Sequence, residues 1–440
     1  MLDPLYTAEE MKAAEAGHDV DELMARAGRA VAEEALRAFP DARSFGAVCG
    51  GGANGGDARI ALEVLRAEGR TAEEGLEGDV LIDALFGTGF RGSPRAEAAA
   101  LIEQVNAAGA PVVAVDLPSG VNADSGEVEG AAVRAEVTVT MHGPKVGLAV
   151  APGRFHAGRV VVADIGLAPA ETEHRLVTHE ILKLVPRRGE RDTKYTAGSV
   201  LVVGGARGTT GAAALCAEAA FRSDAGYVAV CAPAESLPVL ETLLVEAVKR
   251  PLEEVWEAAE RASALALGPG LGRGPEVKEL VRRLLVETDL PAVVDADALF
   301  ELEPVERCAP TVLTPHSGEL GRLLGEDSTS VDAHRLDAAR RASERFGVVC
   351  LLKGADTLVA APGEGTLVYG LGPDSLATAG TGDVLTGIVA AFLAKGLDAR
   401  MATAAAAAAH GLAASLAPHQ TGLVAGDVVD WLPAALDASL

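Results

Sequence analysis

Short runs of hydrophobic residues alternate along the chain with longer segments whose hydrophobic positions recur every three to four residues. This pattern predicts buried strands separated by amphipathic helices, the arrangement of a parallel sheet covered on both faces. After an entry helix around residues 22–36, helices are predicted at residues 59–67 and 95–107. The strands predicted in this first half are residues 45–49, 80–85, 111–116, 137–141 and 160–165.

A second series of the same kind follows, and its predicted strands are residues 199–204, 227–231, 264–268, 292–295, 311–314 and 348–353. A hairpin is expected from residues 357–361 and 366–369, and the polar, Pro-containing residues 168–179 are the predicted linker. A chain of 440 residues is too long for one ordinary core. We therefore expect two α/β domains, residues 1–171 and 172–440.

Composition narrows the class of protein. The chain is 49% hydrophobic and only 3% aromatic, which is typical of Ala-rich helices packed closely on parallel strands. A formal charge of -25 argues against a nucleic-acid or anionic-membrane partner. With no signal peptide and no apolar stretch of membrane length, we expect a cytoplasmic protein. The cysteines form no CxxC pair and are interpreted as small buried hydrophobic residues.

Residues 379–387 read Ala-Gly-Thr-Gly-Asp-Val-Leu-Thr-Gly and lead into an apolar helix. A helix start offers unpaired N–H groups and a positive dipole end, and glycine lets the backbone approach an anion. Asp383 would then lie beside phosphate groups, where its carboxylate could take a proton from an attacking hydroxyl. The alternative is a glycine turn that Asp383 merely caps.

Other polar residues of the second half also follow predicted strands. Asp295 and Asp297 end one strand, His316 follows the next, and Lys353 ends a third. Because ligands of open α/β sheets bind at the carboxyl ends of the strands, these residues and Asp383 are expected to share one site.

Three loops of the first half place oxygen-bearing side chains at strand ends. Residues 50–57, Gly-Gly-Gly-Ala-Asn-Gly-Gly-Asp, open a helix and can wrap phosphate with backbone N–H groups. Together with the loops after residues 83 and 116, they direct four side chains at one crevice, those of Asn54, Asp83, Asp116 and Ser119. Such ligands suit a hard cation, although each residue alone could serve a turn.

The motifs Asn-Gly-Gly-Asp, Asp-Ala-Leu-Phe-Gly-Thr-Gly and Asp-Leu-Pro-Ser-Gly, in this order, resemble the NAD(P)H-hydrate epimerase family over roughly residues 5–170. The resemblance implies a Rossmann-like, three-layer αβα domain that binds K⁺ through Asn54, Asp83 and Ser119. It implies that Asp116 is the acid/base, and Lys145 also matches a family position. The residues implied to hold the dinucleotide are Asp116, Ala53, Asn54, Gly55, Gly56 and Asp57, and Gly87, Thr88, Gly89, Phe90, Arg91, Gly92 and Ser93.

This half also departs from the family pattern. Ala53 and Ala58 replace residues that are usually asparagine and glycine. Residues 70–78 form a short polar bridge where the family usually carries a further strand and helix. A strand missing at this point would narrow the sheet or open the nucleotide site. The alternative to an active epimerase is a domain that keeps the fold and only supports its neighbour.

Roughly residues 180–435 resemble the ADP/ATP-dependent NAD(P)H-hydrate dehydratase family, which implies a ribokinase-like αβα fold. The residues implied to contact the adenine nucleotide are Lys353, Gly354, Ala355, Asp356, Thr357 and Gly382. The residues implied to line the hydrate site are Ala212, Gly270, His316 and Asp383. Phe300 departs from the family, which often has asparagine there, and puts a contact near Asp297 in question.

The fusion of both halves resembles the bifunctional NAD(P)H-hydrate repair enzymes. We therefore expect epimerisation of the R and S hydrates of NADH and NADPH at C6, and nucleotide-dependent dehydration of the S hydrate with release of AMP and phosphate. ADP is the expected nucleotide, with ATP as the alternative, and Mg²⁺, K⁺ and a homo-oligomer are expected. The competing hypotheses are a small-molecule kinase, a binding protein without turnover, and a dehydratase with an inactive epimerase-like domain.

Overall fold

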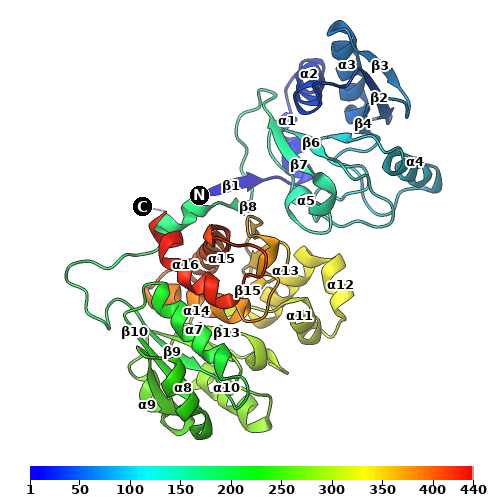
Figure 1. Ribbon diagram of the computed structural model, residues 1–440. Coiled ribbons are helices and arrows are strands. Elements are labelled where there is room, and N and C mark those ends of the chain that lie inside the picture. Colours follow the sequence, from blue (N-terminus) through cyan, green and yellow to red (C-terminus); the bar gives the residue numbers. More distant parts are fainter. Residues whose placement is uncertain (439–440) are drawn as a thin grey trace. The chain divides into compact units, whose positions relative to one another are not determined.

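The computed structural model describes residues 1–438, which form two compact units (Figure 1). One unit comprises Pro4–Arg175 with the short segment Asp332–Leu336, and the other comprises the rest of the chain. The main division thus falls between Arg175 and Leu176. The predicted boundary after residue 171 stays a prediction.

The first unit is built on a six-stranded parallel sheet of order β3-β2-β4-β5-β6-β7. Its strands are β2 (Ser44–Cys49), β3 (Thr71–Glu74), β4 (Val80–Ala84), β5 (Val112–Val115), β6 (Val137–Met141) and β7 (Arg159–Ala163). Its helices are α1 (Ala8–Glu15), α2 (Val20–Ala38), α3 (Ala53–Ala67), α4 (Ala96–Ala107), α5 (Val146–Ala149) and α6 (Arg154–Ala157).

Alternation along the strands explains the three layers of this unit. Ile82 and Val113 pack in a core with α2 and α3. Their neighbours Leu81 and Val112 pack with α4 in a separate core. Because successive side chains of a strand point to opposite faces, the helices cover both sides of the sheet. The predicted αβα architecture is therefore confirmed.

The second unit has a larger sheet of order β1-β8-β17-β16-β15-β14-β13-β12-β9-β10-β11. From β15 to β11 the pairs are parallel, and β15, β16 and β17 pair antiparallel, so the predicted hairpin is confirmed. The strands are β1 (Leu2–Leu5), β8 (His174–Val177), β9 (Ser199–Val203), β10 (Tyr227–Ala232), β11 (Val248–Pro251), β12 (Ala264–Leu267), β13 (Ala292–Val294), β14 (Thr311–Leu313), β15 (Val349–Leu352), β16 (Thr357–Ala360) and β17 (Leu367–Tyr369).

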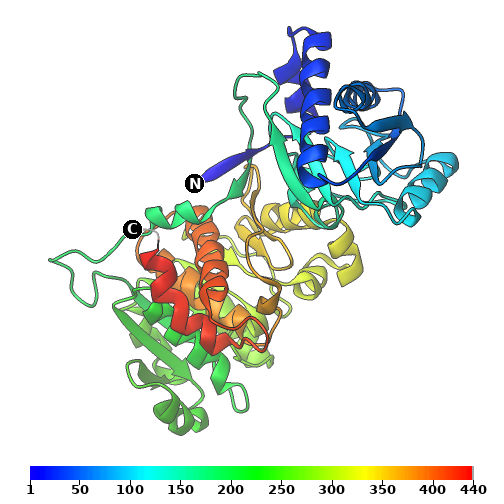
Figure 2. The same ribbon diagram turned by 45° about the horizontal axis from the view of Figure 1, so that its top comes forward.

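Helices cover both faces of this sheet as well. The α-helices are α7 (Thr210–Arg222), α8 (Leu237–Leu243), α9 (Val255–Ala259), α10 (Pro275–Glu287), α11 (Ser317–Leu324), α12 (Ser328–Ala333), α13 (Arg335–Phe346), α14 (Thr381–Ala394), α15 (Ala399–Leu416) and α16 (Ala425–Asp437). The 3₁₀ helices are η1 (His179–Leu184), η2 (Ala234–Ser236), η3 (Leu252–Glu254), η4 (Ala296–Leu299) and η5 (Asp374–Leu376). Helices α7, α14, α15 and α16 share one core, and Figure 2 shows α15 and α16 side by side in orange-red and red. Helices α9 and α10 belong to the core of the opposite face.

Helix α14 begins at the sheet edge because close packing fixes it there. Its N-cap, Gly380, has the left-handed φ of 91° that glycine tolerates best. Farther along, a Cβ atom on Gly387 would lie 2.2 Å from the carbonyl oxygen of Cys216 in α7. Small residues thus let α7 and α14 touch and bring the start of α14 to the carboxyl ends of the strands.

Three expectations about the chain need correction. The missing strand is present: residues 71–74 form β3, which pairs parallel with β2, although only Ala72 of its Thr-Ala-Glu-Glu sequence is buried. The predicted linker contains strand β8 and reaches the first residue of η1. The side chain of Cys308 is exposed and that of Cys49 half-buried, whereas Cys216, Cys231 and Cys350 are buried as expected.

Within residues 1–438, no helix combines the length and the apolar character that crossing a bilayer requires.

Candidate active sites

The second unit holds a buried ion pair at the carboxyl ends of its central strands. Asp295 follows β13 and Lys353 follows β15, and Lys353 Nζ donates to Asp295 Oδ1 at 2.7 Å. The hydroxyl of Thr386 in α14 donates to the other oxygen, Oδ2, also at 2.7 Å. The carboxylate therefore links two strands to the first turns of α14.

Asp383 lies in the first turn of α14, close to this pair. Burial, reinforced by the charge of Asp295, raises the pKa of Asp383 to about 7, although Lys353 opposes the shift. A carboxyl group with such a pKa exchanges protons readily near neutral pH, which is what general acid–base catalysis requires.

Lys353 keeps its positive charge in this environment. Burial alone would lower the pKa of Lys353, but the carboxylates of Asp295 and Glu319 outweigh burial and raise it. Glu319 Oε2 lies 4.0 Å from the ammonium. A Cβ atom on Gly382 would be 3.4 Å from the Lys353 ammonium, so the glycine leaves the helix start open beside a cation. This combination suits the binding of a phosphoryl group.

A cavity of about 570 Å³ adjoins the pair, which is large enough for a nucleotide. The predicted residues that line it are His316, Lys353, Gly354, Ala355, Thr357 and Gly382. Asp356 does not line this cavity, and its side chain is fully buried. His316 caps α11: its Nδ1 accepts from the N–H of Gly318 at 3.0 Å, which leaves the exposed ring beside the cavity.

Several residues of this site escaped the sequence reasoning. Asp295 was recognised only as a strand-end carboxylate, and Thr386 only as part of the glycine motif. Tyr369 and His410 line the cavity from β17 and α15. His410 is buried, its Nε2 has no hydrogen-bond partner, and burial lowers its pKa to about 4, so the ring is neutral. No signal in the Ala-rich sequence of α15 distinguishes His410 from a core residue.

Ala212 and Gly270 lie on neighbouring elements of the same sheet edge. Ala212 is in the first turn of α7, and Gly270, with φ 59°, accepts a hydrogen bond from Thr209 Oγ1 at 3.0 Å. Next to them Asp297 accepts from the N–H of Gly272 at 2.9 Å and from Arg273 at 2.7 Å.

Phe300 therefore does not leave Asp297 without partners. The guanidinium of Arg273 lies over the Phe300 ring, 5.2 Å from its centre, while it contacts Asp297. The Phe300 ring makes a cation–π contact with the same guanidinium that donates a hydrogen bond to the Asp297 carboxylate.

In the first unit, the two predicted glycine loops meet in a cavity of about 500 Å³. The predicted residues that line it are Ala53, Asn54, Gly55, Gly87, Thr88, Gly89 and Phe90. The rings of Phe86 and Phe90 stack at 4.5 Å along its wall. Six predicted residues do not line it, namely Gly56, Asp57, Arg91, Gly92, Ser93 and Asp116.

Asp83, Ser119 and Asn54 gather at the end of β4. Asp83 is buried and accepts from the backbone N–H and the hydroxyl of Ser119 at 2.7 and 2.6 Å. Asn54 Nδ2 donates to the carbonyls of Phe86 and Val115 at 3.1 and 2.6 Å. Burial raises the pKa of Asp83 to about 6 even though the Ser119 bonds oppose the shift. The side-chain oxygens of Asn54, Asp83 and Ser119 are ligands of the kind that suits K⁺. Within residues 1–438, no cluster of three or more His, Cys, Asp or Glu side chains could hold a metal ion.

Asp116 and Lys145 form a second buried ion pair between β5 and β6. Asp116 Oδ1 accepts from the Lys145 ammonium, and from Thr140 Oγ1 and the N–H of Met141 at 3.1 Å each. Asp116 has a left-handed φ of 67°, a conformation that is rare outside glycine and is found at functional sites. These bonds fix one carboxylate oxygen of Asp116.

Two further carboxyl groups lie within electrostatic reach of Asp116. Burial, followed by the charges of Asp116 and Glu15, raises the pKa of Asp57 to about 7. One carboxyl oxygen of Asp57, Oδ1, is buried without a hydrogen-bond partner. The pKa of Glu15 is also raised, mainly by burial and next by the charge of Asp116. The site thus combines a paired carboxylate with two carboxyl groups whose pKa values are raised.

Two family models match the chain. The model described as NAD(P)H-hydrate dehydratase matches residues 200–432, and the model described as YjeF-related protein N-terminus matches residues 20–73 and 66–147. The two stretches of the second model overlap at residues 66–73, which include part of β3.

Curated relatives named bifunctional NAD(P)H-hydrate repair enzyme Nnr match both halves. The relative from Moorella thermoacetica is 38% identical over 87% of this chain and 79% of its own length. The one from Coxiella burnetii is 34% identical over 96% of each chain. The one from Escherichia coli K12 is 34% identical over 90% of this chain and 85% of its own.

Solved structures resemble the second unit. The ADP/ATP-dependent NAD(P)H-hydrate dehydratase of Bacillus subtilis, co-crystallised with ATP/Mg²⁺, is 30% identical with a TM-score of 0.56, and the match covers 60% of this chain and 98% of that one. A ribokinase-like superfamily protein of Enterococcus faecalis matches with a TM-score of 0.55 at 24% identity, over 62% and 98% of the two chains. The second likeness concerns the fold alone, and together they confirm the predicted ribokinase-like fold.

The environment of Asp57 predicts a pH-dependent stability of the first unit. The pKa of Asp57 is near 7 in the folded chain and near 3.8 in the unfolded chain. Between these pH values the Asp57 carboxyl group therefore ionises in the unfolded chain and stays protonated in the folded chain. Stability therefore falls as pH rises through this window and then levels off. Asp57→Asn should remove that loss and raise the stability of the first unit at pH 8 by an amount on the order of 2 kcal/mol, with little gain at pH 4.

Calorimetry of the thermal transition at both pH values measures this effect. The control is Asp41→Asn, which neutralises an exposed carboxylate of the same unit. An equal gain from Asp57→Asn at both pH values would show that Asp57 is ionised in the folded chain throughout.

Proposed function

The chain belongs to the family of bifunctional NAD(P)H-hydrate repair enzymes, and from this premise we propose which side chains perform each of its two reactions. It is an enzyme with an epimerase domain and a dehydratase domain. The epimerase interconverts the R and S hydrates of NADH and NADPH at C6. The dehydratase returns the S hydrate to NAD(P)H with consumption of a nucleotide.

We assign the dehydration to the second unit, with Asp383 as the general base. Asp383 takes the proton of the C6 hydroxyl, and the hydroxyl oxygen attacks the terminal phosphoryl group of the nucleotide. The phosphoryl group moves from ADP to the substrate, which leaves AMP. Phosphate then departs from C6 with the bonding electrons, a proton leaves C5, and the 5,6 double bond of the dihydropyridine is restored. The position of Asp383 beside Lys353 and an open helix start is the observation that supports this assignment.

The charges around Asp383 suit this chemistry. Lys353 and the N–H groups at the start of α14 would stabilise charge that develops on the phosphoryl oxygens. The carboxylates of Asp295, Glu319 and Asp383 leave the site net negative around Lys353, which favours a nucleotide that arrives with a cation. Bound Mg²⁺ would neutralise the phosphate groups. We propose ADP as the nucleotide, with ATP as the alternative, in the cavity lined by residues 353–355, Thr357 and Gly382.

We assign epimerisation to the first unit, with Asp116 as the acid/base. Inversion at C6 requires the hydroxyl to leave with a proton and water to return on the other face with loss of a proton. Asp116 would handle these protons at its second carboxylate oxygen, since Oδ1 is bound by Lys145 and Thr140. Asn54, Asp83 and Ser119 would hold K⁺, which supplies a positive charge close to the dinucleotide. The cavity formed by the two glycine loops would hold that dinucleotide.

The binding partners proposed for the chain are NADHX, NADPHX and an adenine nucleotide. We further propose a homo-oligomer that acts in the cytoplasm. Light scattering of the purified protein tests the oligomeric state.

Asp383→Asn should lower the turnover of the S hydrate by roughly 10²–10⁴-fold, because a general base is lost while the shape of the side chain is kept. Binding of ADP should change little. In the wild type, turnover should rise with pH through about 7, as the carboxyl group of Asp383 ionises. Recovery of reduced-nicotinamide absorbance and release of free phosphate measure the reaction, and Asp430→Asn, on the exposed side of α16, is the control.

Two results would count against this assignment. Turnover of Asp383→Asn close to that of the wild type would remove Asp383 from the role of base. A stable phosphorylated product without free phosphate would indicate a kinase instead of a dehydratase.

Asp116→Asn should abolish consumption of the R hydrate and leave dehydration of the S hydrate intact, because the two reactions use different units. Chiral chromatography of an R/S mixture incubated with ADP measures both rates. If the variant consumed R as fast as the wild type, Asp116 could not be the acid/base.

Replacement of K⁺ by Na⁺ should slow the conversion of R to S. Asp83→Asn should lower this rate in K⁺ and remove the difference between the two salts, because the buried carboxylate that attracts the cation is lost. Asp41→Asn should retain the difference. An epimerisation rate that is equal in KCl and NaCl for the wild type would exclude a functional K⁺ site.

A further inference from the structure

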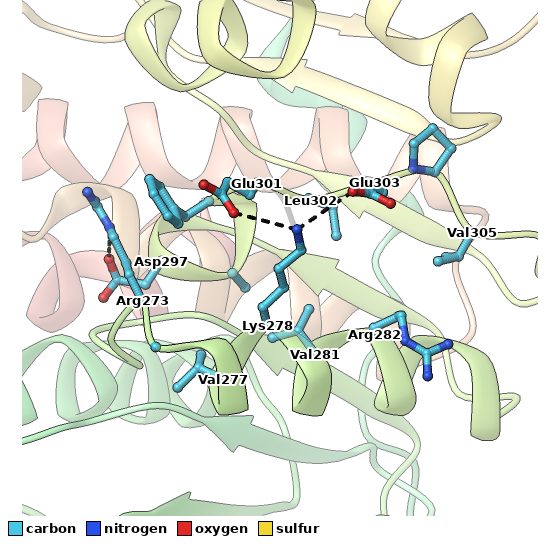
Figure 3. Close-up of a pocket in the computed structure, with 14 residues that line it drawn as sticks. Arg273, Val277, Lys278, Val281, Arg282, Asp297, Glu301, Leu302, Glu303 and Val305 are labelled. Carbon is cyan, nitrogen blue, oxygen red and sulfur yellow. Dashed lines mark hydrogen bonds and ion pairs between the residues drawn. The ribbon is translucent and has the colours of Figure 1, made fainter.

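A smaller hollow of the second unit takes no part in the chemistry assigned above. It has a volume of about 220 Å³ and lies between α10 and residues 297–305 (Figure 3). Its apolar lining includes Val277, Val281, Leu302, Val305 and Phe300. Two segments that each follow a strand of the sheet thus enclose an apolar space at the surface.

Charged side chains surround this hollow. Figure 3 shows Lys278 between Glu301 and Glu303, with its ammonium 3.5 and 3.6 Å from their carboxylates. At the other end, Arg273 donates to Asp297 at 2.7 Å. The Arg273 side chain is 51% exposed, so its guanidinium can bind a further anion.

Asp297 links the hollow to the loop that carries Gly270. This carboxylate lines the hollow, and its charge contributes to the raised pKa of Asp383. It also accepts from the N–H of Gly272, two residues beyond Gly270 in the loop that leads into α10. A dinucleotide whose reacting end lies beside Asp383 and Gly270 would pass Asp297 and Arg273 to reach the hollow.

We propose that this hollow binds the adenosine end of the dinucleotide substrate while the hydrated nicotinamide ring lies beside Asp383. The inference rests on the proposed role of Asp383. A volume of about 220 Å³ is below the roughly 300–1,000 Å³ of a pocket for a whole drug-sized ligand. It suits one base and part of its ribose, with the base against the apolar lining and the pyrophosphate beside Arg273.

The other cavity of this unit is a poorer candidate for the adenosine end of the substrate. The cavity of about 570 Å³ contains Lys353 and Gly382, which the phosphoryl donor needs. Two adenine-bearing ligands must bind at once, since phosphoryl transfer joins the substrate to the nucleotide. The hollow beside α10 gives the second adenine a place of its own.

A matched pair of substitutions on α10 tests the proposal. Val277→Phe fills the hollow from a half-buried position, whereas Val286→Phe adds the same ring at an exposed position of the same helix. Both variants and the wild type are assayed with the S hydrate of NADH and with the S hydrate of reduced nicotinamide mononucleotide, which lacks the adenosine end. Adenosine diphosphate ribose serves as an inhibitor, because it carries the adenosine end without the reacting ring.

Val277→Phe should raise the KM for the NADH hydrate by about tenfold to a hundredfold. This is the loss of affinity expected when one base can no longer be buried. It should leave kcat/KM for the mononucleotide hydrate and the KM for ADP unchanged, and it should weaken competitive inhibition by adenosine diphosphate ribose. Val286→Phe should match the wild type in every assay.

A KM for the NADH hydrate within twofold of the wild type in Val277→Phe would overturn the proposal. An equal loss of kcat/KM with the full and the truncated substrate would also overturn it. The substitution would then have disturbed the reaction site and not the binding of the adenosine end. If Asp383→Asn retained activity while Val277→Phe behaved as expected, the role of Asp383 would fail and the binding site would stand.

Discussion

The carboxylate of Asp295 holds the proposed dehydratase site together. One of its oxygens accepts from Lys353 and the other from Thr386, so that strands β13 and β15 and helix α14 meet at one buried group. Breaking a buried ion pair by removal of one partner leaves an uncompensated charge, which is strongly destabilising. The ammonium and the open helix start are consequently fixed before any ligand binds, as electrostatic stabilisation of a transferring phosphoryl group requires.

The epimerase unit uses a similar pair for a different purpose. Lys145 is fully buried against Asp116, which is itself proposed as the reacting carboxylate. In the dehydratase unit the paired aspartate, Asp295, positions the lysine, and the neighbouring Asp383 has a pKa near neutrality. In both units the parallel sheet supplies the arrangement, because the carboxyl ends of its strands lie along one edge.

The sequence predicted the strands and the strand-end motifs because buried parallel strands are nearly continuous apolar runs. It missed β3, since a surface edge strand with one buried residue has no such pattern, and β8, which lies within a polar segment. It located Asp383 and Lys353 but not the role of Asp295, because which strand-end carboxylate meets the lysine depends on strand order. Residues such as His410 depend on helix packing, which short motifs do not encode.

The central claim is that one chain repairs both hydrates, and the absorbance of reduced nicotinamide tests it most directly. Purified wild-type protein would be incubated with a mixed R/S hydrate, ADP, Mg²⁺ and K⁺. The account predicts full recovery of the absorbance band. Recovery that stops at the S fraction would contradict an active epimerase unit, and absence of any recovery with ADP or ATP would contradict the dehydratase mechanism as well.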